Sequence, residues 1–234
     1  MQEATITAKT QVTPDVYQYT ITLDEGEFDG ELGQHTVLTG DGVDSSKPYT
    51  AVGLDKDSIV LMIRSYPDGR VSKWIGEQEV GDTVSVKPAL SGNLTLDTST
   101  ACQYDHPAVF IATGTGITPL LGLLHNYLQC SGQQAIFVLG EKNRDQLMYK
   151  ALFEQYEQLH NFEFVPVLSR EEWHGLEGYV QEHIDGAIPI LNHADYYVCG
   201  VPPAVVAIKK TLRDHGVDED RIVTEGWEDG VVSE

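Results

Sequence analysis

The chain has 234 residues, of which 41% are hydrophobic and 22% are charged, a composition typical of a globular protein with one or two domains. Its 36 acidic and 15 basic residues give a net charge of −21, which argues against nucleic-acid binding. No apolar run is long enough to cross a membrane, and the opening MQEATITAKTQVTPDV lacks the regions of a secretion signal, so we expect a cytoplasmic protein.

Strands and turns are expected over the first hundred residues. Residues 4–13 and 16–23 alternate apolar and polar side chains around a turn at Pro14-Asp15. The same patterns predict further strands at 35–40, 49–54, 58–66 and 82–88, and a short helix over 72–79 capped by Ser72. Many short strands with one small helix are typical of a closed antiparallel barrel.

The hydrophobic period changes near residue 105. Strands are predicted at 108–112, 135–140, 162–168, 195–200 and 221–227, alternating with helices at 119–130, 144–159, 179–188 and 202–216. Gly132 and Gly216 are expected to end their helices in the left-handed conformation. Alternating strands and helices predict a parallel sheet covered on both faces, with the boundary between the two halves at about 98–107.

The segment VFIATGTGITPLLGLL, residues 109–124, joins a predicted strand to a predicted helix. Gly114 and Gly116 allow the backbone to approach a diphosphate closely, and the helix start offers free N–H groups. Thr118 is expected to cap this helix and Pro119 to begin it. No Gly-Lys-Ser/Thr follows, which excludes a phosphate-loop NTPase, and Pro119 replaces the third glycine of the Rossmann fingerprint. The loop therefore predicts a dinucleotide site, or else a tight turn that only requires glycine.

Four other segments lie in order around this loop: KPYTAV at 47–52, IRSYPDGRVSKWI at 63–75, VLSREEWHGLEGYVQEHI at 167–184 and YYVCGVPPAV at 196–205. Together they closely resemble the ferredoxin–NADP reductase and cytochrome b5 reductase superfamily over nearly the whole chain. The resemblance implies an N-terminal, six-stranded antiparallel β-barrel that binds FAD, over residues 1–100. It implies a C-terminal α/β domain with a parallel sheet that binds NAD(P), over residues 101–234.

The resemblance implies that KPYT contacts the flavin. Tyr49 is expected to pack against the isoalloxazine ring, and Thr50 to hydrogen-bond near flavin N5. Lys47 stands where the family has arginine, which keeps the charge but loses the two-pronged hydrogen bonding of a guanidinium. A second group of FAD-binding residues is implied by the next segment: Arg64, Tyr66, Gly69, Arg70, Val71 and Ser72.

The resemblance also implies the residues that bind the nucleotide diphosphate: Thr113, Gly114, Thr115, Gly116, Thr118 and Pro119. Cys199 and Gly200 are expected beside the nicotinamide. Glu225 and Trp227 stand where the family often ends with an acid and an aromatic residue, although seven residues follow Trp227 here. The catalytic residues implied are Tyr49, Thr50, Cys199 and Glu225.

The nucleotide preference depends on charge, since a 2′-phosphate favours arginine and a free ribose favours a carboxylate. Ser169, Arg170 and Tyr179 resemble the NADPH-type pattern, with Arg170 on the phosphate and Tyr179 against adenine. Lys142 and Arg144 favour the same nucleotide, whereas Glu141 favours NADH. NADPH is therefore expected, and NADH stays possible.

The implied reaction passes a hydride from nicotinamide C4 to flavin N5, in the crevice between the domains, and then electrons to ferredoxin or flavodoxin. A free-flavin, quinone or cytochrome reductase of the same fold is an alternative. A non-catalytic nucleotide-binding module is another, favoured by Lys47 and by the loss of the family's Gly-Pro-x-Gly turn at 88–92. No metal is expected, because the cysteines and histidines lack metal-binding spacing. The acidity indicates either surface solvation in salt or an acidic face for a basic partner.

Overall fold

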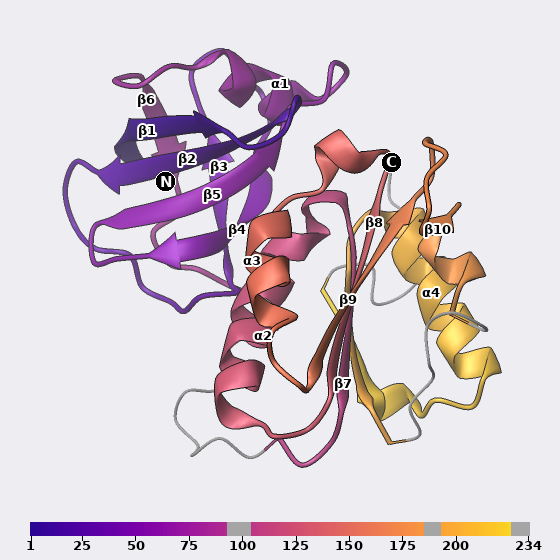
Figure 1. Cartoon of the computed structure of the whole chain (residues 1–234). Helices are drawn as coiled ribbons and strands as arrows, with labels where there is room; N and C mark the ends of the chain where they lie inside the picture. The colour runs from indigo at the N-terminus through magenta and orange to yellow at the C-terminus, as the bar shows by residue number, and fades with distance from the viewer. Residues whose placement is uncertain (93–103, 185–192, 226–234) are drawn as a thin grey trace. The chain divides into compact units, whose positions relative to one another are not determined.

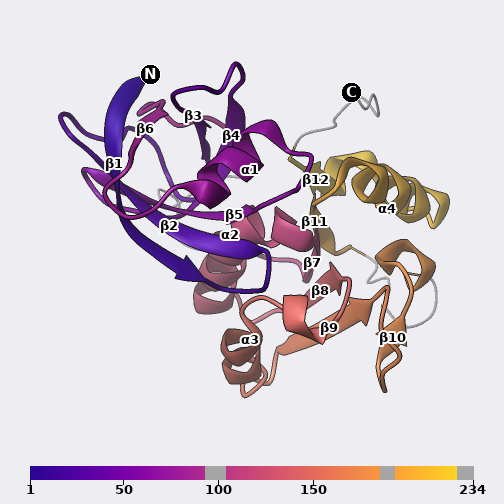
Figure 2. The same ribbon diagram turned by 90° about the horizontal axis from the view of Figure 1, so that it is seen from above.

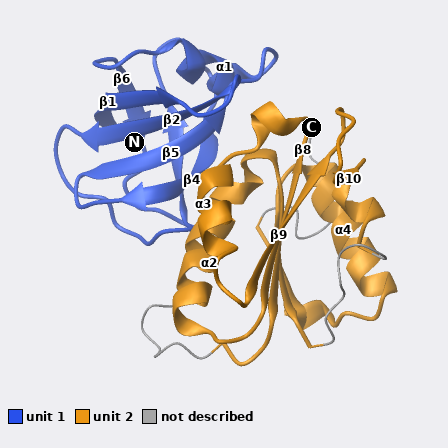
Figure 3. Ribbon diagram, viewed as in Figure 1, with its two compact units in different colours: residues 1–96 blue, residues 97–234 orange. Residues whose placement is uncertain are grey.

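The computed structural model describes residues 1–92, 104–184 and 193–225. The chain divides into two compact units, residues 1–96 and 97–234, which Figure 3 shows in different colours. Within the described residues, no helix combines the length and the apolar character that crossing a bilayer requires.

Unit 1 is a closed antiparallel barrel, as predicted, formed within residues 1–92 by six strands in the order β1-β2-β5-β4-β3-β6 (Figure 1). The strands are β1 (Gln2–Gln11), β2 (Val16–Leu23), β3 (His35–Thr39), β4 (Lys47–Leu54), β5 (Ser58–Arg64) and β6 (Thr83–Val86). The barrel explains the alternation of apolar and polar residues in β2, because Tyr19, Ile21 and Leu23 all point into its core. Pairing of β1 with β6 closes the barrel and removes the free edges.

One helix, α1 (Arg70–Glu77), packs on this barrel through Val71 and Ile75. It begins directly after Gly69, so the prediction that Ser72 caps it was wrong. Its other end is held by β1 and β2. The ammonium of Lys9 donates to the carbonyl oxygens of Gly76, 3.0 Å away, and Gln78, 2.6 Å away. The hydroxyl of Tyr19 donates to the carbonyl of Ile75 at 3.0 Å.

Unit 2 is built on a parallel sheet with the strand order β10-β9-β8-β7-β11-β12 in the part of residues 104–225 that is described. The strands are β7 (Ala108–Thr113), β8 (Ala135–Glu141), β9 (Phe162–Leu168), β10 (Leu176–Glu177), β11 (Asp195–Cys199) and β12 (Ile222–Thr224). The helices are α2 (Ile117–Cys130), α3 (Lys150–Tyr156) and α4 (Pro202–Asp214). The parallel sheet expected from the alternation of strands and helices is confirmed.

Helices cover both faces of this sheet, with α2 and α3 on one face and α4 on the other (Figures 1 and 2). Alternate side chains of the central strand β7 pack against the helices on opposite faces of the sheet. Phe110 contacts Tyr127 of α2, whereas Val109 and Ile111 belong to the same cluster as Val205 of α4. Burial on both faces explains why β7 reads as a continuous apolar run rather than an alternating one.

The strand order places a topological switch point between β7 and β11. From β7 the chain moves outward through β8 and β9 to β10, then returns to β11 on the opposite side of β7. The loops that follow β7 and β11 therefore leave the carboxyl edge of the sheet in opposite directions. In open parallel sheets, this is where a crevice forms and ligands bind.

Several predicted helices differ from those observed. The helix expected over 144–159 is a 3₁₀ turn, η2 (Arg144–Gln146), followed by α3, because Tyr149 between them adopts a left-handed φ of 58°. The helix expected from residue 179 is only a 3₁₀ turn, η3 (Val180–Glu182), as far as the described residues extend. Among the described residues, two further 3₁₀ turns occur, η1 (Gly114–Gly116) and η4 (Glu219–Arg221).

The helix ends give a mixed result. Gly216 ends α4 with a φ of 82°, as predicted. Gly132 was wrongly expected to do the same for α2, whose cap is Ser131 in an extended conformation. Helix α2 starts at Ile117 after Gly116, so Thr118 and Pro119 lie inside its first turn rather than at its cap and first position. Proline is tolerated there because first-turn N–H groups have no partner within the helix.

Candidate functional site

The barrel carries the first group of predicted site residues on β4. Lys47 is exposed, whereas Tyr49 and Thr50 are half-buried, opposite Thr36 and His35 of β3. Burial raises the pKa of the Tyr49 hydroxyl, and the neighbouring Tyr66 raises it further. Tyr49 and Tyr66 therefore lie near each other, with Tyr66 the more exposed of the two at 42%. This arrangement gives the barrel an aromatic surface formed by Tyr49, the strand neighbour of Thr50, and by Tyr66.

The two predicted arginines of this unit have different surroundings. Arg64, at the end of β5, is buried, and its Nε donates to the Oδ1 atom of Asp15 at 3.1 Å. Part of its guanidinium is thus committed to a structural ion pair. Arg70 is exposed at the first position of α1, with one Nη 3.5 Å from the Oδ1 atom of Asp44. Because both partners of this second pair are solvated, the pair is weak and Arg70 is available to a ligand.

The start of α1 forms a close backbone turn. A Cβ atom at Gly69 would lie 2.0 Å from the Oγ atom of Ser72, so only glycine allows the Ser72 hydroxyl to sit over the helix start. The first backbone N–H groups of the helix, including that of Val71, have no intrahelical acceptor. A groove of about 480 Å³ lies here, lined by Gly69 and Arg70 among others. Free N–H groups, a hydroxyl and a guanidinium are the donors that a diphosphate requires.

In unit 2, the predicted diphosphate loop follows β7. Gly114 is buried and has a left-handed φ of 58°, which glycine adopts without strain. The Thr118 hydroxyl donates to the carbonyl of Thr115 at 2.9 Å and fixes the turn from within. Pro119 is buried behind it in the first turn of α2.

This loop packs directly on the end of β11, at the switch point of the sheet. A Cβ atom at Gly116 would lie 2.4 Å from the Cys199 carbonyl oxygen and 2.5 Å from the Cα atom of Gly200. A Cβ atom at Gly200 would lie 2.0 Å from the Oγ1 atom of Thr113. The structure thus brings together residues from two motifs that are far apart in the sequence, and the backbone contact depends on both glycines.

Cys199 and Glu225 also lie close together. Burial, together with the negative charge of Glu225, raises the pKa of the Cys199 thiol to about 12. The thiol is therefore protonated at neutral pH and acts as a small neutral group. Trp227, the predicted aromatic partner, lies outside the described residues.

The remaining predicted residues follow β9, next to the loop that follows β8. The register pairs Glu141 with Leu168, and the backbone N–H groups of Ser169 and Arg170 continue the pairing to the carbonyls of Glu141 and Lys142 at 2.9 and 2.8 Å. Tyr179 is 57% exposed. The two loops therefore meet at the carboxyl edge of the sheet.

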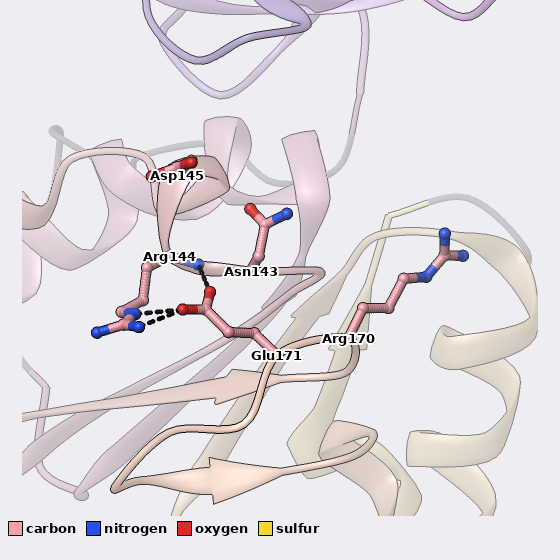
Figure 4. Close-up of a pocket in the computed structure, with 5 residues that line it drawn as sticks. All are labelled: Asn143, Arg144, Asp145, Arg170 and Glu171. Carbon is pink, nitrogen blue, oxygen red and sulfur yellow. Dashed lines mark hydrogen bonds and ion pairs between the residues drawn. The ribbon is translucent and has the colours of Figure 1, made fainter.

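A cavity of about 540 Å³ opens between these loops, lined by Asn143, Arg144, Asp145, Arg170 and Glu171 (Figure 4). Glu171 is turned toward Arg144, whereas the Arg170 side chain extends to the other side. The sequence reading missed Asn143, Asp145 and Glu171. Only the adjacency of Glu171 to Arg170 could have drawn attention to it, because its partner lies on another loop.

Both units contain hydrogen-bond donors and glycine turns that suit phosphate groups. The described residues contain no comparable set of metal ligands. Among residues 1–92, 104–184 and 193–225, no group of three histidine, cysteine, aspartate or glutamate side chains could hold a metal ion. The residues at the start of α1 and at the switch point instead fit two organic diphosphates.

Comparison with known protein families gives one match in each unit. Residues 3–94 match the oxidoreductase FAD-binding domain, and residues 110–210 match the oxidoreductase NAD-binding domain. The two matched regions lie in order along the chain and correspond to the barrel and the parallel sheet.

Curated relatives match both regions. The anthranilate 1,2-dioxygenase electron transfer component of Acinetobacter baylyi is 29% identical over 200 residues, which cover 82% of this chain and 57% of the relative. The NADH-cytochrome b5 reductase 1 of Mortierella alpina is 27% identical over 223 residues, covering 89% of this chain and 72% of the relative. The chain thus spans little more than half the length of the dioxygenase component.

Solved structures share the fold. The cytochrome P450 reductase GcoB of Amycolatopsis has a TM-score of 0.84 and 22% identity, covering 98% of this chain and 71% of that protein. A ferredoxin NADP+ reductase from Neisseria gonorrhoeae, solved with FAD and NADP, has a TM-score of 0.81 and 21% identity, covering 95% and 97%.

Proposed function

The chain belongs to the ferredoxin–NADP reductase-like family of FAD-dependent pyridine-nucleotide oxidoreductases, and from this membership we propose that it transfers electrons from NADPH or NADH to an electron-carrier protein. When bound, FAD accepts a hydride from the nicotinamide and passes its electrons to the acceptor. The protein itself binds, orients and shields the reacting rings rather than acting as an acid or base.

The barrel residues hold the flavin in this proposal. Tyr49 supplies an aromatic face for the isoalloxazine ring, and the half-buried Thr50 hydroxyl hydrogen-bonds near N5. Lys47 and Arg70 are exposed cations that neutralise phosphate charge, and the turn at Gly69 presents the free N–H groups of α1 to the diphosphate.

The observation that supports the nucleotide side best is the contact between the two loops at the switch point. The β7 loop lies against Cys199 and Gly200 so closely that a side chain at Gly116 would not fit. We assign the nucleotide diphosphate to the start of α2 and the nicotinamide to the Cys199 edge. The neutral Cys199 thiol excludes water there, and Glu225 beside it accepts a hydrogen bond from the carboxamide.

We assign NADPH as a substrate, with NADH also accepted. Arg170 offers a guanidinium to the 2′-phosphate, since it makes no hydrogen bond or ion pair through its side chain with the described residues. The exposed ring of Tyr179 is suited to cover the adenine.

The acceptor is proposed to be a ferredoxin, a flavodoxin or a cytochrome. The two curated relatives described above are an electron transfer component and a cytochrome reductase, which favours a protein acceptor over a small molecule. The net charge of −21 adds a constraint, because a strongly acidic carrier would be repelled at low ionic strength. We therefore expect an acceptor with a basic contact surface, or association that strengthens as salt is added.

An absorbance spectrum of the purified protein, before and after anaerobic addition of NADPH or NADH, tests the reaction. Bound FAD that bleaches within seconds of nucleotide addition supports the proposal. A protein that carries no flavin and takes none up from added FAD would instead be a non-catalytic nucleotide-binding module.

A second assay identifies the acceptor. The FAD-loaded protein is given NADPH and, separately, a ferredoxin, a flavodoxin, cytochrome c, cytochrome b5 or free FMN, each at low and high salt. Turnover that is fastest with free FMN, and independent of salt, would contradict the proposed carrier protein.

A further inference from the structure

Two arginines line the cavity at the ends of β8 and β9, and only one of them is paired with an acidic residue in the described part of the chain. Arg170 lines it, but its side chain extends away from Arg144 and makes no hydrogen bond or ion pair with the described residues. Arg144 is held by Glu171, whose Oε1 atom lies 2.5 Å from the Nε atom and also contacts Nη2 (Figure 4). The other carboxylate oxygen accepts the backbone N–H of Arg144 at 2.7 Å. One guanidinium edge is thus filled by a group of the protein itself.

The filled edge, formed by Nε and Nη2, is one of the two guanidinium edges that a phosphate can use. Carboxylates and phosphates bind guanidinium in the same way, through two parallel charge-assisted hydrogen bonds. Glu171 therefore competes for Arg144 with any phosphate that enters the cavity, and its own negative charge repels that phosphate. The pKa of Glu171 is lowered by the hydrogen bonds from Arg144, so the carboxylate stays charged at neutral pH.

We propose that Glu171 sets the nucleotide preference of this chain by occupying Arg144. A 2′-phosphate finds Arg170 available but reaches Arg144 only in competition with Glu171, so the protein discriminates weakly between NADPH and NADH. This inference rests on the proposed function, since it assigns the adenine-side ribose to this cavity. Glu171 thus determines the specificity for NADPH against NADH, because it occupies Arg144, which would otherwise bind the 2′-phosphate.

The contact between Glu171 and Arg144 also stabilises the loops, and the experiment must separate this effect from the effect on nucleotide binding. Glu171 ties the loop after β8 to the loop after β9 through the Arg144 backbone, so removal of the whole side chain would disturb both loops. Glu171→Gln keeps an oxygen for that N–H and removes only the charge. The adjacent Glu172 is exposed and makes no contact with Arg144, so Glu172→Gln is the matched control.

The test measures the binding of oxidised NADP⁺ and NAD⁺ to the FAD-loaded protein by isothermal titration calorimetry. Glu171→Gln is expected to raise the affinity for NADP⁺ about tenfold and to leave that for NAD⁺ within about twofold. Glu172→Gln is expected to change both by less than about threefold. In the double variant Glu171→Gln with Arg144→Gln, the gain should fall to the level of Glu172→Gln, because only the loss of a negative charge then remains.

The outcomes separate this inference from the proposed function. A wild-type protein that binds neither nucleotide contradicts the proposed function itself. A wild-type protein that binds them, with an unchanged NADP⁺ to NAD⁺ ratio in Glu171→Gln, overturns only the role of Glu171. A gain that persists in the double variant overturns it too, because charge removal alone would then explain the effect.

Discussion

The Oγ1 atom of Thr113 accepts a hydrogen bond from the backbone N–H of Val201 at 3.0 Å, although the two residues are 88 positions apart. This bond joins the last residue of β7 to the loop after β11, at the switch point of the sheet. Gly116 and Gly200 allow the two backbones to meet around it. The shape of the nucleotide loop is therefore determined by residues outside its own motif.

The first prediction concerns this close contact. Gly116→Ala places a methyl group 2.4 Å from the Cys199 carbonyl, so the two loops must separate. We expect the free energy of unfolding to fall by about 1–3 kcal/mol and NAD(P)⁺ binding to weaken. Urea unfolding and nucleotide titration measure the two effects. Gly132→Ala is the control, because its Cβ would meet nothing within 4 Å, and equal behaviour of both variants would show that the loops tolerate separation.

The second prediction concerns the Thr50 hydroxyl. Thr50→Val removes one hydrogen bond near flavin N5 and preserves the β-branched shape that suits a strand. We expect FAD content to be unchanged and anaerobic flavin reduction in stopped flow to slow by about tenfold. Thr20→Val, at a half-buried position on β2, should reduce at the wild-type rate. A wild-type rate in Thr50→Val as well would remove the proposed role of the hydroxyl.

The third prediction follows from the raised pKa of Cys199, about 12 against an ordinary value of 9.0. The folded state favours the neutral thiol, so the reactive thiolate should be scarce up to about pH 10. Iodoacetamide labelling of the Cys199 peptide, followed by mass spectrometry at pH 7 to 11, should lag far behind labelling in urea. Glu225→Gln removes a nearby negative charge and should shift the labelling profile to lower pH. Rapid labelling of the folded wild type at pH 8 would contradict the prediction.

The fourth prediction concerns Lys9, whose side chain is only 11% exposed and whose ammonium caps the end of α1. Lys9→Met leaves the Gly76 and Gln78 carbonyls without this donor. We expect a loss of about 2 kcal/mol in unfolding free energy and weaker FAD binding, since α1 presents its other end to the diphosphate. Chemical denaturation and FAD titration measure both.

A matched control for Lys9 is available in the same barrel. Lys56 pairs with Glu27 at 2.8 Å, but both side chains are largely exposed. Lys56→Met should therefore change the unfolding free energy by less than about 0.5 kcal/mol. Similar losses in the two variants would mean that burial of the Lys9 ammonium adds nothing.

The barrel and the parallel sheet were both predictable, because side-chain burial repeats with the period of the backbone. Tyr19, Ile21 and Leu23 recur at every second position of a strand with one buried face, and β7 is apolar throughout because both of its faces are covered. Helix boundaries were less predictable. The amphipathic pattern over 144–159 gives no sign that Tyr149 adopts a left-handed φ and divides the helix.

The candidate site was predictable where it depends on short motifs. The glycines of the β7 loop could be read directly, and Gly114 has the left-handed φ that its turn requires. The close approach of Gly116 to Cys199 could not be read, because Cys199 lies on a strand more than 80 residues later. The contact between Arg144 and Glu171 could not, because it arises from the register of β8 with β9, which aligns Glu141 with Leu168. The burial of Lys9 likewise depends on where α1 ends relative to β1.

The position of β7 in the middle of the sheet has a consequence for how unit 2 folds. Its neighbour β11 lies more than 80 residues later, in the last fifth of the chain, so the loop that β11 contacts is incomplete until β11 has been made and paired. During synthesis, nucleotide affinity should therefore appear late and all at once. A cell that supplies ample nucleotide would then favour the finished fold over its partly assembled precursors.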